Sequence, residues 1–429
     1  MPARRTSSSP APASSQNTPG KTPDFDVVLL GSGLGIYALS RAFHEAYGVV
    51  STVLAVKAPE PMLRSVTCEV VDLPSGVDDA GRLQALLDLA QQRPAGRRTL
   101  LLGNTDGDID FIARHADTLN PHYALRIPSA ETVKKLADKA HFAQLCTDLE
   151  IAIPDTVVID FGGEQMPELP HLPFSFPVVA KPAVAEPHVR LRMAGKKKVY
   201  FLQNREELLD LIQRLHSAGF QDRFVVQELI PGDDTAMRSI TAYRDAQGNI
   251  TLLAGAKVLL EEHTPDALGR PAAMITADFP EQFAQVRRLL EATNYVGFAN
   301  ADIKEDPRDG SQRFLEINPR IGRNSYYVTG AGANVATFLV ADAVENRVTE
   351  PCVGVPEILY SIVPTSLILR YMTDPDQRAW VRSVARRRTV NPWIYRAERL
   401  WMRAYAEAVR LNHVRKFRRY YPKPSQTGF

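Results

Sequence analysis

The chain has 429 residues, which is too long for a single small core and predicts two or three domains. Its 51 basic and 49 acidic residues leave a formal net charge of +2, so bulk charge does not favour nucleic acid or a membrane surface as partner. Cys68, Cys146 and Cys352 lack CxxC spacing, which argues against a disulfide framework or a zinc site. No apolar run approaches the roughly 20 residues that a membrane span requires. These features predict a soluble cytoplasmic protein.

The N-terminal third of the sequence predicts a tail followed by a small α/β domain. Residues 1–24 are rich in Ser, Pro and Ala and lack an apolar h-region, so they predict a disordered tail rather than a signal peptide. A strand, a glycine turn, a helix and a second strand are then expected at 27–30, 31–35, 36–47 and 51–56. With a further apolar strand at 99–104, residues 25–125 predict an open α/β domain with parallel strands.

The glycines in GSGLG are a weak signal for a dinucleotide site. A third glycine is expected where Ile36 stands, and an acid for the ribose is expected where Lys57 stands. The motif therefore favours a tight strand-to-helix turn over NAD binding. A substrate phosphate or carboxylate at the helix N-terminus stays open as an alternative.

Residues 126–348 form a strand-rich, mixed α+β block. It begins with a helix expected at 129–151, for which Ser129 and Thr132 are candidate N-terminal caps. Short strands are expected in IPDTVVI, FPVVAKPAV, KKVYFL and FVVQELI, with a helix at 205–219 between the last two. Further strands are expected in SITAYRD, ITLLAGAKVLLEE, FANADIKED and QRFLEIN.

The last two of these strands predict a hairpin through PRDGS. A symmetric register sets Asp302 opposite Glu316 and Asn300 opposite Asn318, so Asp302, Glu316 and Asn318 share one face. Facing carboxylates repel unless a cation lies between them, and an all-oxygen set indicates Mg²⁺ or Mn²⁺. Because Mg²⁺ keeps open positions for phosphate oxygens, the hairpin implies a phosphate-bearing ligand.

The alternative is a surface hairpin whose acids are solvated. Leu315 and Ile317 argue against it, because they predict that the second strand packs on a core. No GxxxxGK[ST] motif occurs, so the sequence does not predict a P-loop for the phosphates.

Four basic residues are candidates to hold phosphate oxygens. Lys181 lies in the apolar strand VVAKPA, where a lysine is costly to bury without an anion, and Lys139 lies on the preceding helix. Lys198 belongs to the basic loop RMAGKKKVYF and is expected to point inward, because it borders apolar residues. Arg320 follows the metal strand and carries a fork of donors suited to a phosphoryl group.

Five features follow one another along the chain: Lys139, AKP at 180–182, QELIPGDD at 227–234, NADIK at 300–304 and FLEINPR at 314–320. Their order resembles that of the ATP-grasp superfamily. The sequence is most similar to its carboxylate–amine ligases of the D-aspartate ligase type. The similarity extends to VLLGSGLGIYALSRAFHEAYGV and NHVRKFRRYY, and so covers most of the chain from residue 25. It implies an N-terminal open α/β domain, a two-subdomain ATP-grasp fold at 126–348 and a basic helical region at 349–429.

The resemblance also implies roles for the matching positions. Lys139 and Lys181 would contact the ATP phosphates, and Arg320 would stabilise the transferring phosphoryl group. Mg²⁺ ions would be held by Asp302, Glu316 and Asn318. The hinge between the two subdomains would consist of Gln227, Glu228, Leu229 and Ile230. Glu228 and Ile230 would lie near the adenine, and Asp233 or Asp234 near the ribose. Asp302 departs from the glutamate that many ATP-grasp enzymes carry at this position.

The reaction implied by the resemblance forms an amide or isopeptide bond. A carboxylate attacks the γ-phosphate of ATP to give an acyl-phosphate and ADP, and an amine then displaces phosphate. The acid would be D-aspartate or a similar amino acid, and the amine would belong to a diamino acid in a UDP-linked peptidoglycan precursor. Lys257 is a further candidate active-site cation, His263 is placed in a loop over the substrates, and Arg323 and Asn324 are candidates to bind the amino acid's carboxylate. The alternatives are a ligase that makes a dipeptide or other small metabolite and a catalytically degenerate nucleotide-binding protein.

The C-terminal region predicts basic helices. From Val381 to Tyr420, arginine and lysine greatly outnumber the two acids, Glu398 and Glu407, and aromatic residues interleave with them. Specific nucleic-acid binding is disfavoured. An arm that packs its aromatic residues on the protein body and a surface that attracts an anionic substrate are equally open, and peripheral contact with anionic lipid is a further alternative.

Overall fold

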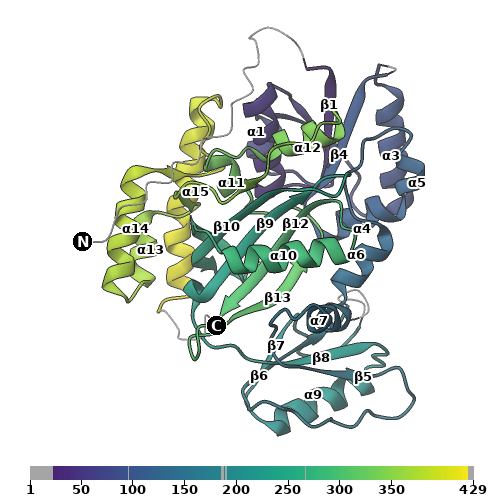
Figure 1. Cartoon of the computed structure of the whole chain (residues 1–429), viewed down its shortest axis with the longest axis vertical. Helices are drawn as coiled ribbons and strands as arrows, with labels where there is room; N and C mark the ends of the chain where they lie inside the picture. Colours follow the sequence, from purple (N-terminus) through teal and green to yellow (C-terminus); the bar gives the residue numbers. More distant parts are fainter. Residues whose placement is uncertain (1–22, 95, 185–187, 189–190, 266, 424–429) are drawn as a thin grey trace.

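The computed structural model describes residues 23–94, 96–184, 188, 191–265 and 267–423. Within these residues the strands form three sheets, and helices from distant parts of the sequence pack on them (Figure 1). One four-stranded sheet belongs to the N-terminal domain, and a second belongs to a small lobe at the bottom of Figure 1. An eight-stranded sheet lies between them. In the described part of the chain, no helix is long and apolar enough to cross a membrane.

The N-terminal sheet confirms the expected parallel α/β arrangement, with strand order β3-β2-β1-β4. Its strands are β1 (Phe25–Leu30), β2 (Ser51–Ala55), β3 (Cys68–Asp72) and β4 (Arg98–Gly103). Its helices are α1 (Leu34–Tyr47), α2 (Glu60–Leu63), α3 (Asp79–Gln91), α4 (Asp106–Arg114) and α5 (Ala116–Leu119). The GSGLG glycines make a tight turn, because Gly33 has a φ of 87° and a Cβ on Gly35 would lie 2.0 Å from Asn104 Oδ1.

The small lobe is an antiparallel sheet in the order β5-β8-β6-β7. Its elements are β5 (Thr156–Asp160), β6 (Val178–Pro182), β7 (Tyr200–Leu202), α9 (Arg205–Ser217) and β8 (Arg223–Glu228). These elements match the expected strands and helix to within a few residues at each end.

The prediction of a single helix at 129–151 is wrong, because two helices occupy this segment: α6 (Ala130–Ala137) and α7 (Lys139–Asp148). Asp138 lies between them in an extended conformation, and its carboxylate accepts hydrogen bonds from Ala140 N and His141 N. Asp138 also pairs with Arg223 of β8. Ser129 caps α6 as predicted, whereas Thr132 donates its backbone N–H to Ser129 rather than capping.

The eight-stranded sheet carries the predicted hairpin at one edge. Seven strands follow the order β13-β12-β9-β10-β11-β15-β16, and β14 pairs with β10. The strands are β9 (Met237–Arg244), β10 (Ile250–Glu262), β11 (Arg270–Thr276), β12 (Gly297–Glu305), β13 (Gln312–Asn318), β14 (Cys352–Val353), β15 (Leu359–Ser361) and β16 (Thr389–Val390). The region from 349 therefore adds three short strands to this sheet besides its expected helices.

Helices cover both faces of this sheet. Sequence patterns did not predict α10 (Pro280–Ala292), which packs on one face with β12 and β13 (Figure 1). A short 3-10 helix, η1 (Asp234–Ala236), precedes β9. On the opposite face, α11 (Tyr326–Gly330) and α12 (Val335–Ala343) share a core with α1 of the N-terminal domain. The N-terminal domain and the large sheet thus pack as neighbours around one apolar core.

The C-terminal helices are α13 (Thr365–Tyr371), α14 (Pro375–Arg387) and α15 (Leu400–Tyr420). The segment before α15 packs on the N-terminal domain, since Trp393 stacks on Tyr37 at 4.5 Å between ring centroids. The buried Glu398 carboxylate accepts hydrogen bonds from Tyr37 Oη at 3.1 Å and Val66 N at 3.2 Å. Part of the basic arm therefore packs on the body, whereas Trp401 remains exposed.

Candidate active site

The pairing of β12 with β13 is confirmed at the two pairs that the sequence predicted. Asp302 lies opposite Glu316, and Asn300 lies opposite Asn318. Because side chains two residues apart on a strand share a face, the two carboxylates and the Asn318 amide lie on one face of the sheet. The alternating pattern and the short turn were enough to predict this register, and β12 also pairs with β9 on its other side.

A bulge follows this pair and corrects one expectation. The next pairing is Ile303 with Phe314, so Leu315 is the extra residue on β13. Phe314 and Ile317 are therefore the residues of β13 that enter the core, at 0% and 2% exposure. The prediction that Leu315 faces the core is wrong, because the bulge turns it out of the alternation and leaves it partly exposed.

The Asp302 carboxylate is held by amide and hydroxyl donors. Asn318 Nδ2 donates to Asp302 Oδ2 at 3.0 Å, Asn300 Nδ2 donates to Oδ1 at 3.1 Å, and Ser239 Oγ lies 3.5 Å from Oδ1. Both acids keep some solvent contact, yet surrounding protein atoms weaken their hydration. Burial, reinforced by the facing Glu316 carboxylate, raises the pKa of Asp302 to about 7. Without a cation between them, an ionised Asp302 therefore repels the facing Glu316 carboxylate.

Glu316 keeps its charge because lysines from the small lobe face it. Burial by itself raises the pKa of Glu316, but Lys181, Lys139 and Lys198 outweigh burial and hold this pKa below its usual range. Burial lowers the pKa of Lys181 to about 8 and also lowers that of Lys139, and Glu316 opposes both shifts. These charges come from three elements far apart in the sequence and converge on one space between the lobe and the large sheet.

The three lysines reach this space in different ways. Lys181 is a half-buried residue of β6. Lys139 is the first residue of α7, and its backbone N–H and its Nζ both donate to Ala183 O, at 3.1 and 3.5 Å. Lys198 is exposed, so the expectation that it points inward is wrong. It lies in the loop before β7, where its charge acts on Glu316 across solvent-accessible space.

Arg320 lies beside the acids, as predicted. Its Nη2 donates to Asn318 Oδ1 at 2.9 Å, and its Nε donates to Asp106 Oδ1 at 2.9 Å. Asp106 begins α4 of the N-terminal domain, and Asn104 Nδ2 of the same loop donates to Ile321 O at 3.2 Å. Sequence reasoning missed this support from the N-terminal domain, since more than 200 residues separate the partners and no local motif joins them.

The donor set fits a hard cation that shares its shell with a ligand. Among the described residues, no group of three or more His, Cys, Asp and Glu side chains could hold a metal. The set is instead two carboxylates and one amide, which leaves several coordination positions for water or phosphate oxygens. That incomplete oxygen shell is the one Mg²⁺ takes in phosphate sites.

The predicted hinge residues lie where the chain leaves the small lobe. Gln227 is buried and donates through Nε2 to Thr156 Oγ1 at 2.9 Å. Glu228 ends β8, and its carboxylate pairs with Arg308 of the β12–β13 turn. Leu229 is partly exposed and Ile230 is buried, just before η1 and the large sheet. The structure thus places Gln227 to Ile230 between the two sheets.

Asp233 and Asp234 are engaged inside the protein. Asp233 accepts a hydrogen bond from Thr235 N at 2.9 Å and so caps η1. Asp234 is buried, and its Oδ2 accepts hydrogen bonds from Glu261 N at 2.8 Å and from His263 Nε2 at 2.9 Å. His263, which was expected in a loop over the substrates, directly follows β10, is 9% exposed and stacks on Tyr421 at 3.6 Å, so its role at the substrates stays a prediction.

Lys257 lies on the wrong face for the predicted catalytic role. In the strand register, Lys257 lies opposite Arg238 of β9, and Arg238 lies opposite Ile303 of β12. Asp302, the neighbour of Ile303, lies opposite Ser239 instead. Neighbouring strand positions point to opposite faces, so Lys257 lies on the α10 side of the sheet. Burial lowers the pKa of Lys257, and the neighbouring Arg238 lowers it further.

Arg323 and Asn324 follow β13 but point to different partners. Arg323 Nη1 donates to Glu262 Oε1 at 2.9 Å, and its side chain is 31% exposed. Asn324 is buried and donates through Nδ2 to Met274 Sδ at 2.9 Å. Arg323 therefore keeps the accessibility that a substrate contact needs, and Asn324 is largely used within the fold.

No family model matches the chain. It is 29% identical over 414 residues to a D-aspartate ligase from Enterococcus faecium, which covers 93% of this chain and 97% of that protein. A crystal structure of an L-amino acid ligase from Bacillus licheniformis is similar with a TM-score of 0.52 at 17% identity, over 76% of this chain and 75% of that one. An ADP complex of N5-carboxyaminoimidazole ribonucleotide synthetase is similar with a TM-score of 0.54 at 15% identity, over 79% and 81% of the two chains. At these identities the solved structures show a common fold.

Proposed function

We propose that this chain is an ATP-grasp carboxylate–amine ligase that adds D-aspartate, or a similar acidic amino acid, to the side-chain amine of a peptidoglycan precursor. The observation that carries the proposal is the cluster in which Asp302, Glu316 and Asn318 face Lys139 and Lys181, with Arg320 and Lys198 beside them. Similarity to D-aspartate ligase over nearly the whole chain supports the choice of amino acid.

We assign ATP and Mg²⁺ to this cluster. The biotin carboxylase domain of Hydrogenobacter thermophilus 2-oxoglutarate carboxylase, with a TM-score of 0.56 at 14% identity, was solved in complex with MgADP, ADP and bicarbonate, which supports a nucleotide and Mg²⁺ in this fold. Asp302, Glu316 and Asn318 would hold the metal, and the same oxygen ligands accept Mn²⁺. Bound there, the ion neutralises charge on the phosphate oxygens. Lys139, Lys181 and Lys198 would bind the phosphates, and residues 227–234 would border the nucleoside.

The proposed reaction has two steps that these residues position. An oxygen of the amino acid's carboxylate attacks the γ-phosphorus of ATP, and the bond to the ADP oxygen breaks. Arg320 then lies beside the transferring group and stabilises its negative charge. The acceptor amine attacks the acyl carbon, the bond to phosphate breaks, and the amine releases a proton as the amide forms. The protein supplies orientation and charge neutralisation rather than a covalent nucleophile.

The basic C-terminal region supports an anionic acceptor. Arg382, Arg386 and Arg387 of α14 are exposed, and so are Arg415 and Arg418 of α15. A UDP-linked precursor carries phosphates and carboxylates, so these arginines would raise its local concentration near the protein. Salt would weaken this attraction, because exposed charges are screened within about 10 Å at 0.1 M ionic strength.

Phosphate release tests the proposal directly. We expect the protein to release phosphate when ATP, Mg²⁺, D-aspartate and a lysine-containing UDP-linked peptide are all present. Omitting the amino acid, the peptide or the metal in turn supplies the controls, and mass spectrometry of the peptide identifies the product. Turnover with simple amino acids as acceptors and none with the peptide would replace this proposal by a dipeptide ligase. ATP binding without turnover under any condition would indicate a degenerate nucleotide-binding protein.

ATP affinity should fall as pH rises above 8. The pKa of Lys181 lies near 8 in the free protein, and phosphate binds its protonated form. Above that pH, binding must take up a proton, so the dissociation constant should rise by up to about tenfold per pH unit. The effect is measured by calorimetric titration of a non-hydrolysable ATP analogue between pH 7 and 9.5.

Substitution separates Lys181 from other titrating groups in this experiment. Lys181→Arg should flatten the pH dependence, because a guanidinium stays protonated throughout the range. Lys135→Arg, at an exposed position on α6, is the matched control and should retain the dependence. An affinity that is constant from pH 7 to 9.5 in the unmodified protein would remove Lys181 from the phosphate site.

A further inference from the structure

A cavity of about 300 Å³ lies at the edge of the large sheet that is opposite the β12–β13 hairpin. Its walls come from α1 of the N-terminal domain, from β15 and β16 with the segments that follow them, and from α15. Along β12-β9-β10-β11-β15 there are four strand spacings, which at about 4.8 Å each amount to about 19 Å. The cavity is therefore separate from the proposed ATP and metal site.

Arg41 of α1 is the most deeply buried charged residue of the cavity wall, at 8% exposure. Its Nη1 donates to three backbone carbonyls of residues 391–394 at 2.7 to 3.0 Å, and its Nε donates to Glu45 Oε1 at 2.8 Å. The guanidinium carbon lies 4.3 Å from the ring centroid of Tyr326 and 4.6 Å from that of Tyr395. These contacts fix the C-terminal segment on α1, yet Nη2 donates to no residue that the structure describes. A rigidly held donor is thus left for the cavity.

Further donors line the same cavity. Arg410 of α15 uses only Nε, which donates to Glu407 Oε2 at 2.6 Å, so both Nη atoms lack a partner in the described part of the chain. Asn391 accepts a hydrogen bond from Trp393 N through Oδ1, which leaves its Nδ2 without a described acceptor. Thr365 adds a hydroxyl. Since Glu407 is the only carboxylate among the described lining residues, donors outnumber acceptors and favour a ligand rich in acceptor oxygens.

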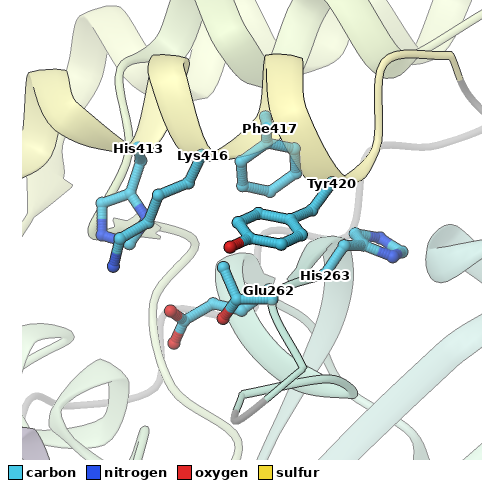
Figure 2. Close-up of a pocket in the computed structure, with 7 residues that line it drawn as sticks. Glu262, His263, His413, Lys416, Phe417 and Tyr420 are labelled. Atoms are coloured by element: carbon cyan, nitrogen blue, oxygen red, sulfur yellow. The ribbon is translucent and has the colours of Figure 1, made fainter.

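The α15 wall of the cavity is anchored on the protein body. Two turns beyond Arg410, the Phe417 ring lies 5.9 Å from the His263 ring between centroids, and Phe417 is 3% exposed. Figure 2 shows Phe417 and Tyr420 of α15 above Glu262 and His263 at the end of β10. Arg410 therefore has a defined position and does not belong to a free arm.

The size of the cavity and its apolar residues indicate an organic ligand. Val363, Val390 and Ile394 line it beside the donors, so part of its wall suits an apolar or ring-shaped group. A volume of about 300 Å³ lies at the lower end of small-molecule sites, and an inorganic anion alone would fill only a fraction of it.

We infer that this cavity binds a phosphorylated organic molecule of about nucleotide size, at a second site apart from that for ATP. Arg41 Nη2 and the free nitrogens of Arg410 would hold phosphate oxygens, and Asn391 and Thr365 would complete the set. A phosphate suits these donors better than a carboxylate does, because it presents three terminal oxygens to groups that come from different elements. The ligand would join α1 of the N-terminal domain to α15.

The phosphate can belong to the anionic acceptor of the proposed ligation or to a separate effector. The cavity lies on the sheet face that carries the two acids: Tyr326 stacks on Arg41, and the next residue, Tyr327, places its Oη 3.1 Å from Thr241 Oγ1, opposite Asn300. An extended residue covers about 3.3–3.6 Å, so a sugar and a few residues span about 20 Å. One acceptor molecule can therefore reach both the cavity and the catalytic cluster.

Arg410→Gln tests the site, because Arg410 is 30% exposed and its loss leaves the buried contacts of Arg41 in place. We expect UDP to bind the unmodified protein in calorimetric titrations while a non-hydrolysable ATP analogue and Mg²⁺ occupy the catalytic site. Arg410→Gln should weaken UDP by about 10- to 100-fold, the usual loss for a charge-assisted hydrogen bond. Arg403→Gln is the matched control, since Arg403 lies two turns earlier on the same side of α15, is partly exposed and does not line the cavity.

Two further measurements keep this test decisive. Pyrophosphate should compete with UDP, whereas uridine, which lacks phosphate, should bind much more weakly. Thr365→Val removes a donor without changing charge and should also weaken UDP, which provides a second variant if Arg410→Gln lowers the melting temperature. Absence of binding by both UDP and pyrophosphate, or equal UDP affinity in the unmodified and Arg410→Gln proteins, would overturn the site.

Kinetics with two forms of the acceptor identify the source of the phosphate. For the acceptor, Arg410→Gln should raise KM for the UDP-linked peptide by about 10- to 100-fold and leave KM for the same peptide without UDP unchanged. For an effector, both KM values should stay unchanged, while UDP alters kcat of the unmodified protein and not of Arg410→Gln. An equal rise in both KM values would place the peptide in the cavity and overturn the phosphate site. UDP binding that Arg410→Gln weakens, with no phosphate release under any condition, would support the site and refute the proposed ligation.

Discussion

Glu316→Gln should abolish measurable turnover, with kcat lowered at least about 100-fold, while the fold persists. Glu316 is the carboxylate that Lys181, Lys139 and Lys198 keep ionised, so its loss would remove a proposed metal ligand and the counter-charge of those lysines together. Glutamine has nearly the same shape, and it also relieves the repulsion of Asp302 across the hairpin. The acid is therefore expected to matter for function far more than for packing.

Steady-state phosphate release and thermal unfolding measure the two parts of this prediction. The melting temperature in metal-free buffer should change by no more than a few degrees. Glu305→Gln is the matched control, because Glu305 lies on the same hairpin, is 40% exposed and pairs with Arg238 instead. A large fall in melting temperature for Glu316→Gln in metal-free buffer would mean that this acid is primarily structural.

Arg320→Met should lower kcat by about 10³-fold and leave ATP affinity within a few-fold. The Arg320 guanidinium is oriented by Asn318 on one side and Asp106 on the other, so its donors are in place before a phosphoryl group arrives. Methionine retains the length of the side chain and removes its charge. Single-turnover phosphate release and analogue titration separate the chemical step from nucleotide binding.

Asp106 provides a way to distinguish a charge effect at Arg320 from loss of its orientation. Asp106→Asn leaves the guanidinium charged and retains its contact with Asn318, and Asp106 is 60% exposed, so kcat should fall by less than about tenfold. Equal losses in Arg320→Met and Asp106→Asn would show that the N-terminal domain contact, rather than the charge on the phosphoryl group, limits the rate. A comparable rise in KM for ATP in Arg320→Met would place Arg320 in ground-state binding.

Features that depend on near neighbours in the chain were predictable from the residues alone. Alternation along two strands and a short turn are enough to set Asp302 against Glu316, because both are properties of a single hairpin. The same holds for the parallel strands of the N-terminal domain and for the tight glycine turn at Gly33 and Gly35. A motif order spread over the chain then predicted the fold to which these elements belong.

Which charged side chains meet depends on how distant elements pack, and the sequence did not predict it. The bulge at Leu315, the position of Lys257 on the α10 face and the burial of His263 beside Asp234 each depend on packing or pairing that no local pattern encodes. Lys416 lies beside Glu262 and His263 because α15 crosses the end of β10, about 150 residues away in the chain. The physical reason is that side-chain direction within an element follows from backbone geometry, whereas electrostatic contacts between elements follow from how their apolar faces pack.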